Sequence, residues 1–216
     1  MDTDDLYIYY SRRASEYERI YEKPERQEDL AVLNDRISAL LNERDVLEVA
    51  CGTGYWTEVI SQVARSILSI DISAEVISIA KTKSYQDNRV SFAIADANNL
   101  NDIQGRFDAG FAGFWWSHMR KQDIPSFLST LHRRLDKGAR LVFADNAYVQ
   151  GSSTPIAYRD QGGNTYQDRR LNDGSVYRIL KNFPSEDELR EFLPSEARDV
   201  EVNLLRYYWI LSYRIN

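Results

Sequence analysis

An acidic residue inside an apolar run, followed by a Gly-x-Gly turn, is the feature of this sequence that most directly suggests chemistry. The run 46–50 carries Glu48 and breaks at Gly52-Thr53-Gly54, and a helix is predicted to start at Tyr55. In a strand–turn–helix unit of this kind a ligand can approach the backbone closely, because glycine has no side chain. The segment therefore predicts a binding site for a nucleotide-like cofactor.

Two aspartates follow later apolar runs, at positions where they would face the same site. Asp71 follows the run 66–70, and Asp96 comes just after the run 90–94. One ionised carboxylate can accept hydrogen bonds from both hydroxyls of a ribose. Other roles stay open, because Asp71 could cap the next helix, as Ser73 also could, and Asp96 could be an ordinary loop residue.

The glycine turn lacks one feature of dinucleotide-binding proteins. Their fingerprint has a third glycine three residues after the second, which lets the helix pack closely on the strand. Here Thr57 occupies that position, and the bulky residues Tyr55 and Trp56 precede it. A nicotinamide cofactor is therefore disfavoured.

The fuller pattern, Glu-x-x-x-Gly-x-Gly with an acidic residue after the next strand, resembles the class I methyltransferases that use S-adenosylmethionine. The resemblance implies that the turn borders the methionine part of the cofactor, that Asp71 holds the ribose hydroxyls, and that Asp96 lies near the adenine amino group. Glu48 matches the acidic residue inside the first strand, although it could instead only bind backbone amides near the turn. The cofactor-binding residues expected in this way are Tyr17, Glu48, Ala50, Gly52, Thr53, Gly54, Trp56, Thr57, Asp71, Ile72, Asp96 and Ala97.

Apolar runs that alternate with helical patterns indicate an α/β fold. The runs expected as strands are 45–50, 66–70, 90–94, 106–113 and 140–145. Helices are expected at 24–42, from the glycine turn to 64, at 73–83 and at 124–135, the last one closed by Asp136-Lys137-Gly138. This alternation predicts a doubly wound, Rossmann-like, mostly parallel sheet.

The pattern changes after residue 146. Two short runs flank Asn172-Asp173-Gly174, a strong hairpin signal, and Ser185 with Glu188 forms a capping box before a short helix. Strands at 199–206 and 207–215 would add an antiparallel C-terminal edge. We expect a single methyltransferase domain over 1–216, made of an N-terminal helical lid (1–42), a cofactor-binding core (43–146), a substrate-cap insertion with the hairpin (147–198) and the C-terminal strands (199–216).

The loop after the fourth strand is the first candidate for acceptor recognition, since in the resembling family it borders the transferred methyl group. His118 is the candidate general base, because an imidazole with a pKa near 6.5 suits removal of a proton from a hydroxyl or ammonium group. It could instead only bind a backbone carbonyl. Trp115 and Trp116 could line the pocket or pack into the core.

Three further segments should converge on the acceptor: the N-terminal segment, the end of the fifth strand at Asp145-Asn146, and the hairpin. Tyrosines and Arg13 recur at helical spacing near the N-terminus, as a lid or as a helix packed on the sheet edge. Basic residues in the hairpin suggest an anionic acceptor such as a carboxylate, although a solvated face explains them as well, and alternation places Arg169 and Arg170 on opposite faces. The expected acceptor-binding residues are Tyr9, Arg13, Trp115, Trp116, Asn146, Tyr166 and Arg169.

Composition narrows the function classes. The chain has 216 residues, 43% of them hydrophobic, and a net charge of −6, so nucleic acid is not an expected partner. The acidic start does not resemble a signal peptide, no apolar run is long enough for a membrane span, and one cysteine with two distant histidines makes no metal site. We expect a cytoplasmic monomer or homodimer.

The expected function is methyl transfer from S-adenosylmethionine to an oxygen or nitrogen of a small molecule, with an anionic acceptor as the hypothesis that the hairpin suggests. The alternatives are a protein or RNA methyltransferase, a nicotinamide-dependent oxidoreductase and a non-catalytic cofactor-binding module. The motif Asn/Asp-Pro-Pro-Tyr/Phe, which is expected for amino-group methylation of bases or glutamine, is absent after the fourth strand.

Overall fold

The computed structural model describes residue 9, residues 14–85 and residues 89–216. The expected acceptor residue Arg13 lies outside these parts, and so does the side chain of the expected cofactor residue Tyr17. The segment predicted as an N-terminal lid is described from a 3-10 helix, η1 (Ala14–Tyr21), onward.

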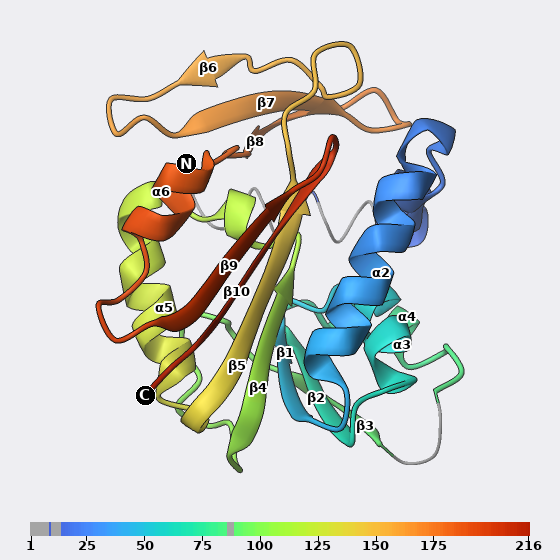
Figure 1. The fold of residues 1–216 in the computed structure, drawn as a ribbon. Helices are drawn as coiled ribbons and strands as arrows, with labels where there is room; N and C mark the ends of the chain where they lie inside the picture. The colour runs from blue at the N-terminus through green and yellow to red at the C-terminus, as the bar shows by residue number, and fades with distance from the viewer. Residues whose placement is uncertain (1–8, 10–13, 86–88) are drawn as a thin grey trace.

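The described residues form one large sheet of seven strands in the order β3-β2-β1-β4-β5-β10-β9 (Figure 1). The five strands from β3 to β5 are parallel, which confirms the predicted Rossmann-like sheet. β10 is antiparallel to both β5 and β9, so the antiparallel C-terminal strand lies one position in from the edge. The strands are β1 (Asp45–Val49), β2 (Ser66–Asp71), β3 (Val90–Ile94), β4 (Phe107–Gly113), β5 (Leu135–Asn146), β9 (Arg198–Leu204) and β10 (Tyr208–Arg214).

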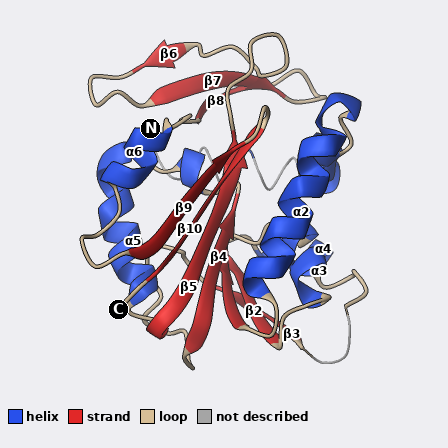
Figure 2. Ribbon diagram, viewed as in Figure 1, coloured by secondary structure: helices blue, strands red, loops and turns tan. Residues whose placement is uncertain are grey.

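Helices cover both faces of this sheet (Figure 2). One face carries α2 (Gln27–Leu41), α3 (Tyr55–Ser61) and α4 (Ala74–Ala80), and the other carries α5 (Ile124–His132) and α6 (Glu186–Glu191). α2 buries Leu30, Leu33, Ile37 and Leu41, because these residues recur at the helical period on one face. Among the described helices, none is long and apolar enough to cross a membrane.

The boundary between α5 and β5 differs from the prediction. α5 ends at His132, and β5 already begins at Leu135, so Asp136, Lys137 and Gly138 belong to the strand and do not cap the helix. Gly138 has a φ of +81°, which resembles a helix C-cap in sequence, but its amide donates to the carbonyl of Ile215 near the end of the chain. Pairing with the C-terminal segment therefore decides this conformation.

The insertion after β5 forms a second, three-stranded sheet over the end of the large sheet where β5 finishes (Figure 1). We call it the cap sheet; it consists of 3 strands, β6 (Tyr158–Arg159), β7 (Thr165–Arg170) and β8 (Val176–Leu180). The predicted hairpin is confirmed as β7 and β8, whereas β6 was not predicted.

The register of the hairpin divides its side chains between two faces. Gln167 pairs with Ile179 and Arg169 pairs with Tyr177, so these four share one side, which we call the Arg169 face. Thr165 and Lys181 extend this face, because the Lys181 amide donates to the Thr165 carbonyl. The opposite side, the Tyr166 face, contains Tyr166, Asp168, Arg170, Arg178 and Leu180.

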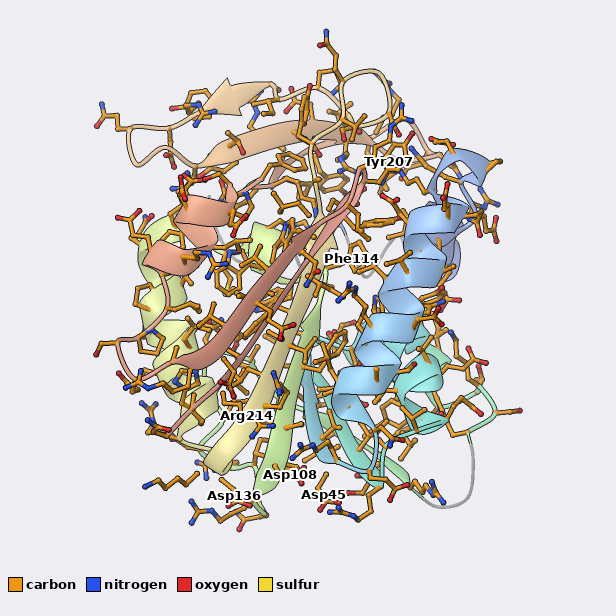
Figure 3. All side chains as sticks on the ribbon, in the orientation of Figure 1. Asp45, Asp108, Phe114, Asp136, Tyr207 and Arg214 are labelled. Atoms are coloured by element: carbon orange, nitrogen blue, oxygen red, sulfur yellow. The ribbon has the colours of Figure 1, made fainter. Side chains whose placement is uncertain are left out.

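Charged side chains lie at one end of the large sheet, and aromatic side chains lie at the other end (Figure 3). Asp45, Asp108, Asp136 and Arg214 lie at the end away from the cap sheet, where Asp108 and Asp136 pair with arginines at 3.6 and 2.7 Å. Phe114 and Tyr207 lie at the other end, beneath the cap sheet. The predicted site residues also belong to that end, because it holds the carboxyl ends of the parallel strands.

Candidate active site

The glycine turn between β1 and α3 has the backbone shape that the sequence predicts. Ala50, Gly52 and Gly54 all have positive φ, at 53°, 55° and 82°. A Cβ atom on Gly54 would lie only 2.7 Å from the Tyr85 hydroxyl, so this glycine is required by packing. A Cβ on Gly52 would meet no atom within 4 Å, so the backbone of Gly52 borders open space, as a ligand site requires.

The carboxylate of Asp71 is held against this turn. Its Oδ2 accepts the amide of Gly52 at 2.9 Å, and its Oδ1 accepts the amide of Ser73 at 2.9 Å. Burial raises the pKa of Asp71, although the two amides oppose the shift. Ser73 caps α4 by accepting the amide of Val76, so the alternative role considered for Asp71 is filled by Ser73.

Apolar side chains flank Asp71 and Asp96 at the ends of β2 and β3. Ile72 is 52% exposed and Ile94 is 62% exposed, and Ile94 lies opposite Asp71 in the parallel register. Asp96 is exposed, and its Oδ1 accepts the amide of Asn98 at 2.8 Å. Two carboxylates beside an exposed apolar surface suit a ribose and a flat base, and Ala97, which is buried, follows directly.

Glu48 lies behind the turn, in the interior of the sheet. Its Oε2 accepts the hydroxyls of Thr57 and Ser69, both at 2.6 Å. Burial raises the pKa of this carboxyl to about 7, although the two hydroxyls oppose the shift. Glu48 thus joins β1, β2 and α3 through hydroxyls rather than through the backbone amides considered as its alternative partners.

Thr53 connects the turn to the N-terminal segment. Its hydroxyl donates to Glu18 Oε1 at 2.7 Å, and Glu18 in η1 also pairs with Lys83 at 2.7 Å. Trp56 points the other way, is 3% exposed, and stacks on Phe114 with ring centroids 5.9 Å apart. An expected cofactor contact of Trp56 is therefore confined to its backbone at the start of α3.

The loop after β4 begins with strained backbone and separates the two tryptophans. Phe114 has a φ of 60°, which is unusual for a residue with a side chain. Trp116 is 1% exposed and contacts Phe143 and Trp209 edge-on, so the prediction that it lines the acceptor pocket is wrong. Its indole is buried because the core between β5, β10 and the loop needs a large apolar group there.

Trp115 is half-buried and lines a cavity of about 660 Å³. This cavity lies between the loop, the start of α5 and the Tyr166 face of the hairpin, and His118 and Tyr166 also line it. Asn98, two residues after Asp96, lies on its wall, so the cavity borders the Asp96 end of the site.

His118 is buried between the loop and the cap sheet. Its Nδ1 lies 2.8 Å from the carbonyl oxygen of Leu180, which can only accept, so Nδ1 carries the proton and Nε2 carries the lone pair. Burial, and next the Lys181 ammonium, lower the pKa of His118 to about 3. The ring is therefore neutral near pH 7, and the carbonyl bond considered as an alternative is present.

Asp145 and Lys181 form a buried ion pair beside this histidine. Lys181 Nζ lies 3.0 Å from Asp145 Oδ1 and donates to the Ser117 hydroxyl at 2.6 Å, while Asp145 Oδ2 accepts the Ser117 amide at 2.9 Å. Although burial opposes ionisation, the Lys181 ammonium helps to hold the pKa of Asp145 below its ordinary value. The end of β5, the loop after β4 and the end of β8 are thereby joined.

Comparisons with known proteins decide the family. A family model described as a methyltransferase domain matches residues 46–138, the segment with the glycine turn and both aspartates. The solved complex of DhpI with SAH (S-adenosyl-L-homocysteine) has a TM-score of 0.79 at 26% identity, and covers 99% of this chain and 96% of that one. A DhpI complex with SAM and HEP gives 0.78 at 26% identity, covering 98% and 96%. The chain contains a methyltransferase domain over residues 46–138, and its fold is that of the class I S-adenosylmethionine-dependent methyltransferases.

Curated relatives of this methyltransferase support the same family. The malonyl-[acyl-carrier protein] O-methyltransferase of Hamiltonella defensa subsp. Acyrthosiphon pisum is 26% identical over 144 residues, which cover 65% of this chain and 53% of that protein. The chain spans about half the length of the first curated relatives that it matches. The expected cofactor, S-adenosylmethionine, is confirmed as that of the family.

The expected acceptor residues of the methyltransferase fall into separate places. Trp115 and Tyr166 line the cavity on the Tyr166 face. Tyr9 is buried and lies 5.8 Å from the Tyr177 ring, on the side of the hairpin that carries Arg169. Asn146 accepts from Arg26 Nη1 at 3.2 Å, at the end of β5.

Arg26 is a residue of this region that the sequence did not predict. It ends a short 3-10 helix, η2 (Pro24–Arg26), and is 6% exposed. In sequence it stands in Pro-Glu-Arg at a helix start, where an arginine is usually solvated. No local signal distinguishes it, because contacts with distant residues bury it.

Proposed function

We propose that this methyltransferase transfers a methyl group from S-adenosylmethionine to an oxygen or nitrogen of a small acceptor, for which the basic hairpin favours an anion. The observation that carries the proposal is the open side of Gly52 beside the fixed carboxylate of Asp71. Together they place an uncovered backbone segment beside a carboxylate that can accept hydrogen bonds from the two ribose hydroxyls.

The residues present fit this cofactor. The backbone of the glycine turn would border the methionine part, Asp71 would accept the ribose hydroxyls, and Ile72 with Asp96 would flank the adenine. When bound, S-adenosylmethionine supplies an electrophilic methyl group on a sulfonium. The strained residues Ala50 and Phe114 directly follow the neighbouring strands β1 and β4, where a fixed backbone shape helps to align reactants.

The surrounding residues would exclude water and handle the acceptor proton. Thr53 and Glu18 connect η1 to the turn, so the N-terminal segment covers one side of the site. His118 is the candidate proton acceptor through Nε2, since Nδ1 already donates to Leu180. Its low pKa makes it a weak base, so alignment is expected to supply most of the rate.

Isothermal calorimetry with S-adenosylmethionine, SAH and NADH tests the proposal. We expect micromolar binding of the first two ligands and none of NADH. Binding of NADH alone would favour the oxidoreductase alternative. Binding of neither adenosyl compound would overturn the proposal. Tritiated methyl transfer into a library of small carboxylic acids, alcohols and amines, with total RNA and a protein extract as further acceptors, then separates the acceptor classes.

A further inference from the structure

Arg26 carries a buried positive charge for which the described residues provide no ion-pair partner. Its Nη1 donates to Asn146 and its Nη2 to Ser152 Oγ at 3.0 Å, while Nε is buried without an acceptor. Its guanidinium lies 5.2 and 5.8 Å from the ring centres of Tyr207 and Tyr208. Since buried charges in proteins are normally paired, this arrangement is incomplete without an anion.

Arg169 is a second half-buried guanidinium without a carboxylate within 4.0 Å in the described structure. Its Nε donates to Gln167 Oε1 at 3.1 Å, and Gln167, fully buried, is fixed by a bond to the Thr154 carbonyl. On the opposite face of the same hairpin, Arg178 pairs with Asp168 at 2.8 Å. Arg169 is thus held in place by a neutral group, and its charge is not compensated.

Both arginines lie near the buried ammonium of Lys181. Asn146, which accepts from Arg26, donates to the same Asp145 oxygen that pairs with Lys181, and Arg169 shares its face of the hairpin with Lys181. Burial, and then the charges of Arg169 and Arg26, lower the pKa of Lys181, although Asp145 opposes this shift. Asp145 is the carboxylate bonded to Lys181 and can balance one of the three cations. Two further carboxylates lie near Arg26: the exposed Glu25, which accepts the Ser152 hydroxyl, and Asp29, which accepts the Tyr207 amide; neither forms an ion pair with Arg26 within 4.0 Å in the described residues. The group Arg26, Arg169 and Lys181 therefore has an excess of positive charge.

Arg26, Arg169 and Lys181 lie where an acceptor, rather than the cofactor, is expected to bind. Asp71 and Asp96 follow β2 and β3, and the glycine turn follows β1. Asp145 and Asn146 end β5, which lies on the other side of β4 from the turn. Along the strand order, Asp71 and Asp96, at the predicted adenine end, lie on one side of the glycine turn. The three cations lie on the other side of this turn, beyond the predicted methionine end.

We infer that the acceptor carries an oxyanion, a carboxylate or a phosphate-type group, which Arg26 and Arg169 bind and Lys181 attracts. Guanidinium groups present several donors in a plane that matches such oxygens. This inference rests on the proposed function and adds the chemical class of its acceptor. It also places the oxyanion of the acceptor on the Arg169 face of the hairpin.

Titration of the SAH-saturated protein with inorganic phosphate and with acetate tests this site. We expect at least one anion to bind, and Arg169→Met to weaken it tenfold or more, as loss of a charged hydrogen bond does. Arg170→Met is the matched control, because this neighbour is exposed on the opposite face, and we expect a change below twofold. Arg26→Lys keeps the charge but loses the planar set of guanidinium donors, so it should weaken binding to an intermediate degree.

The outcomes separate this inference from the proposed function. Unchanged SAH affinity in Arg169→Met with lost anion binding supports both. Normal SAH binding, with no anion bound by the wild type or with equal losses in Arg169→Met and Arg170→Met, overturns the oxyanion site alone. If SAH does not bind, the proposed function fails, and the same anion titration on the free protein still decides whether the site exists.

Discussion

Lys181 and Asp145, from the cap sheet and the large sheet, face each other at 3.0 Å with at most 5% of either side chain exposed. Through Ser117, which contacts both, this pair fixes the loop after β4 that also carries His118. Asn182 strengthens the connection, since its amide donates to the Ser117 carbonyl and its side chain to the Met119 carbonyl. The ion pair therefore joins the cap sheet, the end of β5 and the loop after β4.

Replacing Lys181 by Met should lower the free energy of unfolding by about 3–5 kcal/mol, because Asp145 is left charged and buried without its partner. Urea unfolding at pH 7 measures the change. The double variant Lys181→Met/Asp145→Asn should recover part of the loss, since it removes the uncompensated charge. A loss below about 1 kcal/mol in the single variant would show that the pair is not needed for stability.

Gly52→Ala should reduce affinity for S-adenosylmethionine by about tenfold or more, because the new methyl group enters the open space beside the turn. Gly151→Ala is the matched control, since its φ is +85° and its Cβ would also meet no atom within 4 Å. Both variants should lose a similar stability, about 1–2 kcal/mol, through left-handed backbone strain. Calorimetry and thermal unfolding on both proteins separate strain from obstruction, and equal affinities would contradict the cofactor position.

Asp71→Asn should weaken S-adenosylmethionine binding about ten- to hundredfold, because a charged acceptor of two hydroxyls becomes a neutral amide. Asp102→Asn, an exposed aspartate in the segment after β3, serves as the control and should bind normally. Calorimetric titration of both variants measures the difference. If Asp71→Asn binds as tightly as the control, Asp71 serves only to hold the amides of Gly52 and Ser73.

Glu48→Gln should change the pH dependence of stability between pH 4.5 and about 7. The pKa of Glu48 is raised from 4.5 to about 7, so the folded protein binds more protons than the unfolded chain in this range. The contribution of Glu48 is thus fully present below pH 4.5 and is lost as pH rises through 7, by about 3 kcal/mol. Glutamine does not titrate and can still accept from Thr57 and Ser69.

Urea unfolding of both proteins at pH 5 and pH 8 checks this prediction. His118 and His132, with pKa values lowered to about 3 and about 4, act in the opposite direction below pH 6.5. They are common to both proteins, so their effect cancels in the difference. An equal difference at both pH values would mean that Glu48 does not titrate in this window.

His118→Gln should lower kcat by about a hundredfold, the low end for general bases, because its pKa of about 3 gives little affinity for a proton. Glutamine keeps a donor for the Leu180 carbonyl, so the loop should retain its shape. The wild-type kcat should show no inflection near pH 6.5. Full turnover of His118→Gln from pH 5 to 8 would assign catalysis to alignment alone.

The sequence predicted the parallel core and the glycine turn with Asp71 beside it, because both depend on local patterns. The turn after β1 needs glycine at Gly52 and Gly54, and Asp71 stands directly at a strand end, so position along the chain sets their location. The capping box at Ser185 and the hairpin at Asn172-Asp173-Gly174 were local signals of the same kind, and both are present.

The acceptor half could be predicted only in part, because long-range contacts decide it. Trp115 and Trp116 are neighbours with equal hydrophobicity, yet one lines a cavity and the other is enclosed by Phe143 and Trp209. The positions of Arg26 and Lys181 depend on Asn146 and Asp145 at the end of a distant strand. No periodicity in the sequence predicts such long-range contacts.

The alternation of side chains in β7 and β8 has a consequence for how acceptor preference can change. Arg169 shares its face with Lys181, which pairs with Asp145 at the end of β5, whereas Arg170 is an exposed residue of the opposite face. The register of the hairpin around Asn172-Asp173-Gly174 decides which face each arginine occupies. Insertion or deletion of one residue ahead of Arg169 in β7 would exchange the two faces. Under the proposed oxyanion site, a one-residue change of register within this hairpin would therefore alter acceptor preference and leave the glycine turn and Asp71 unchanged.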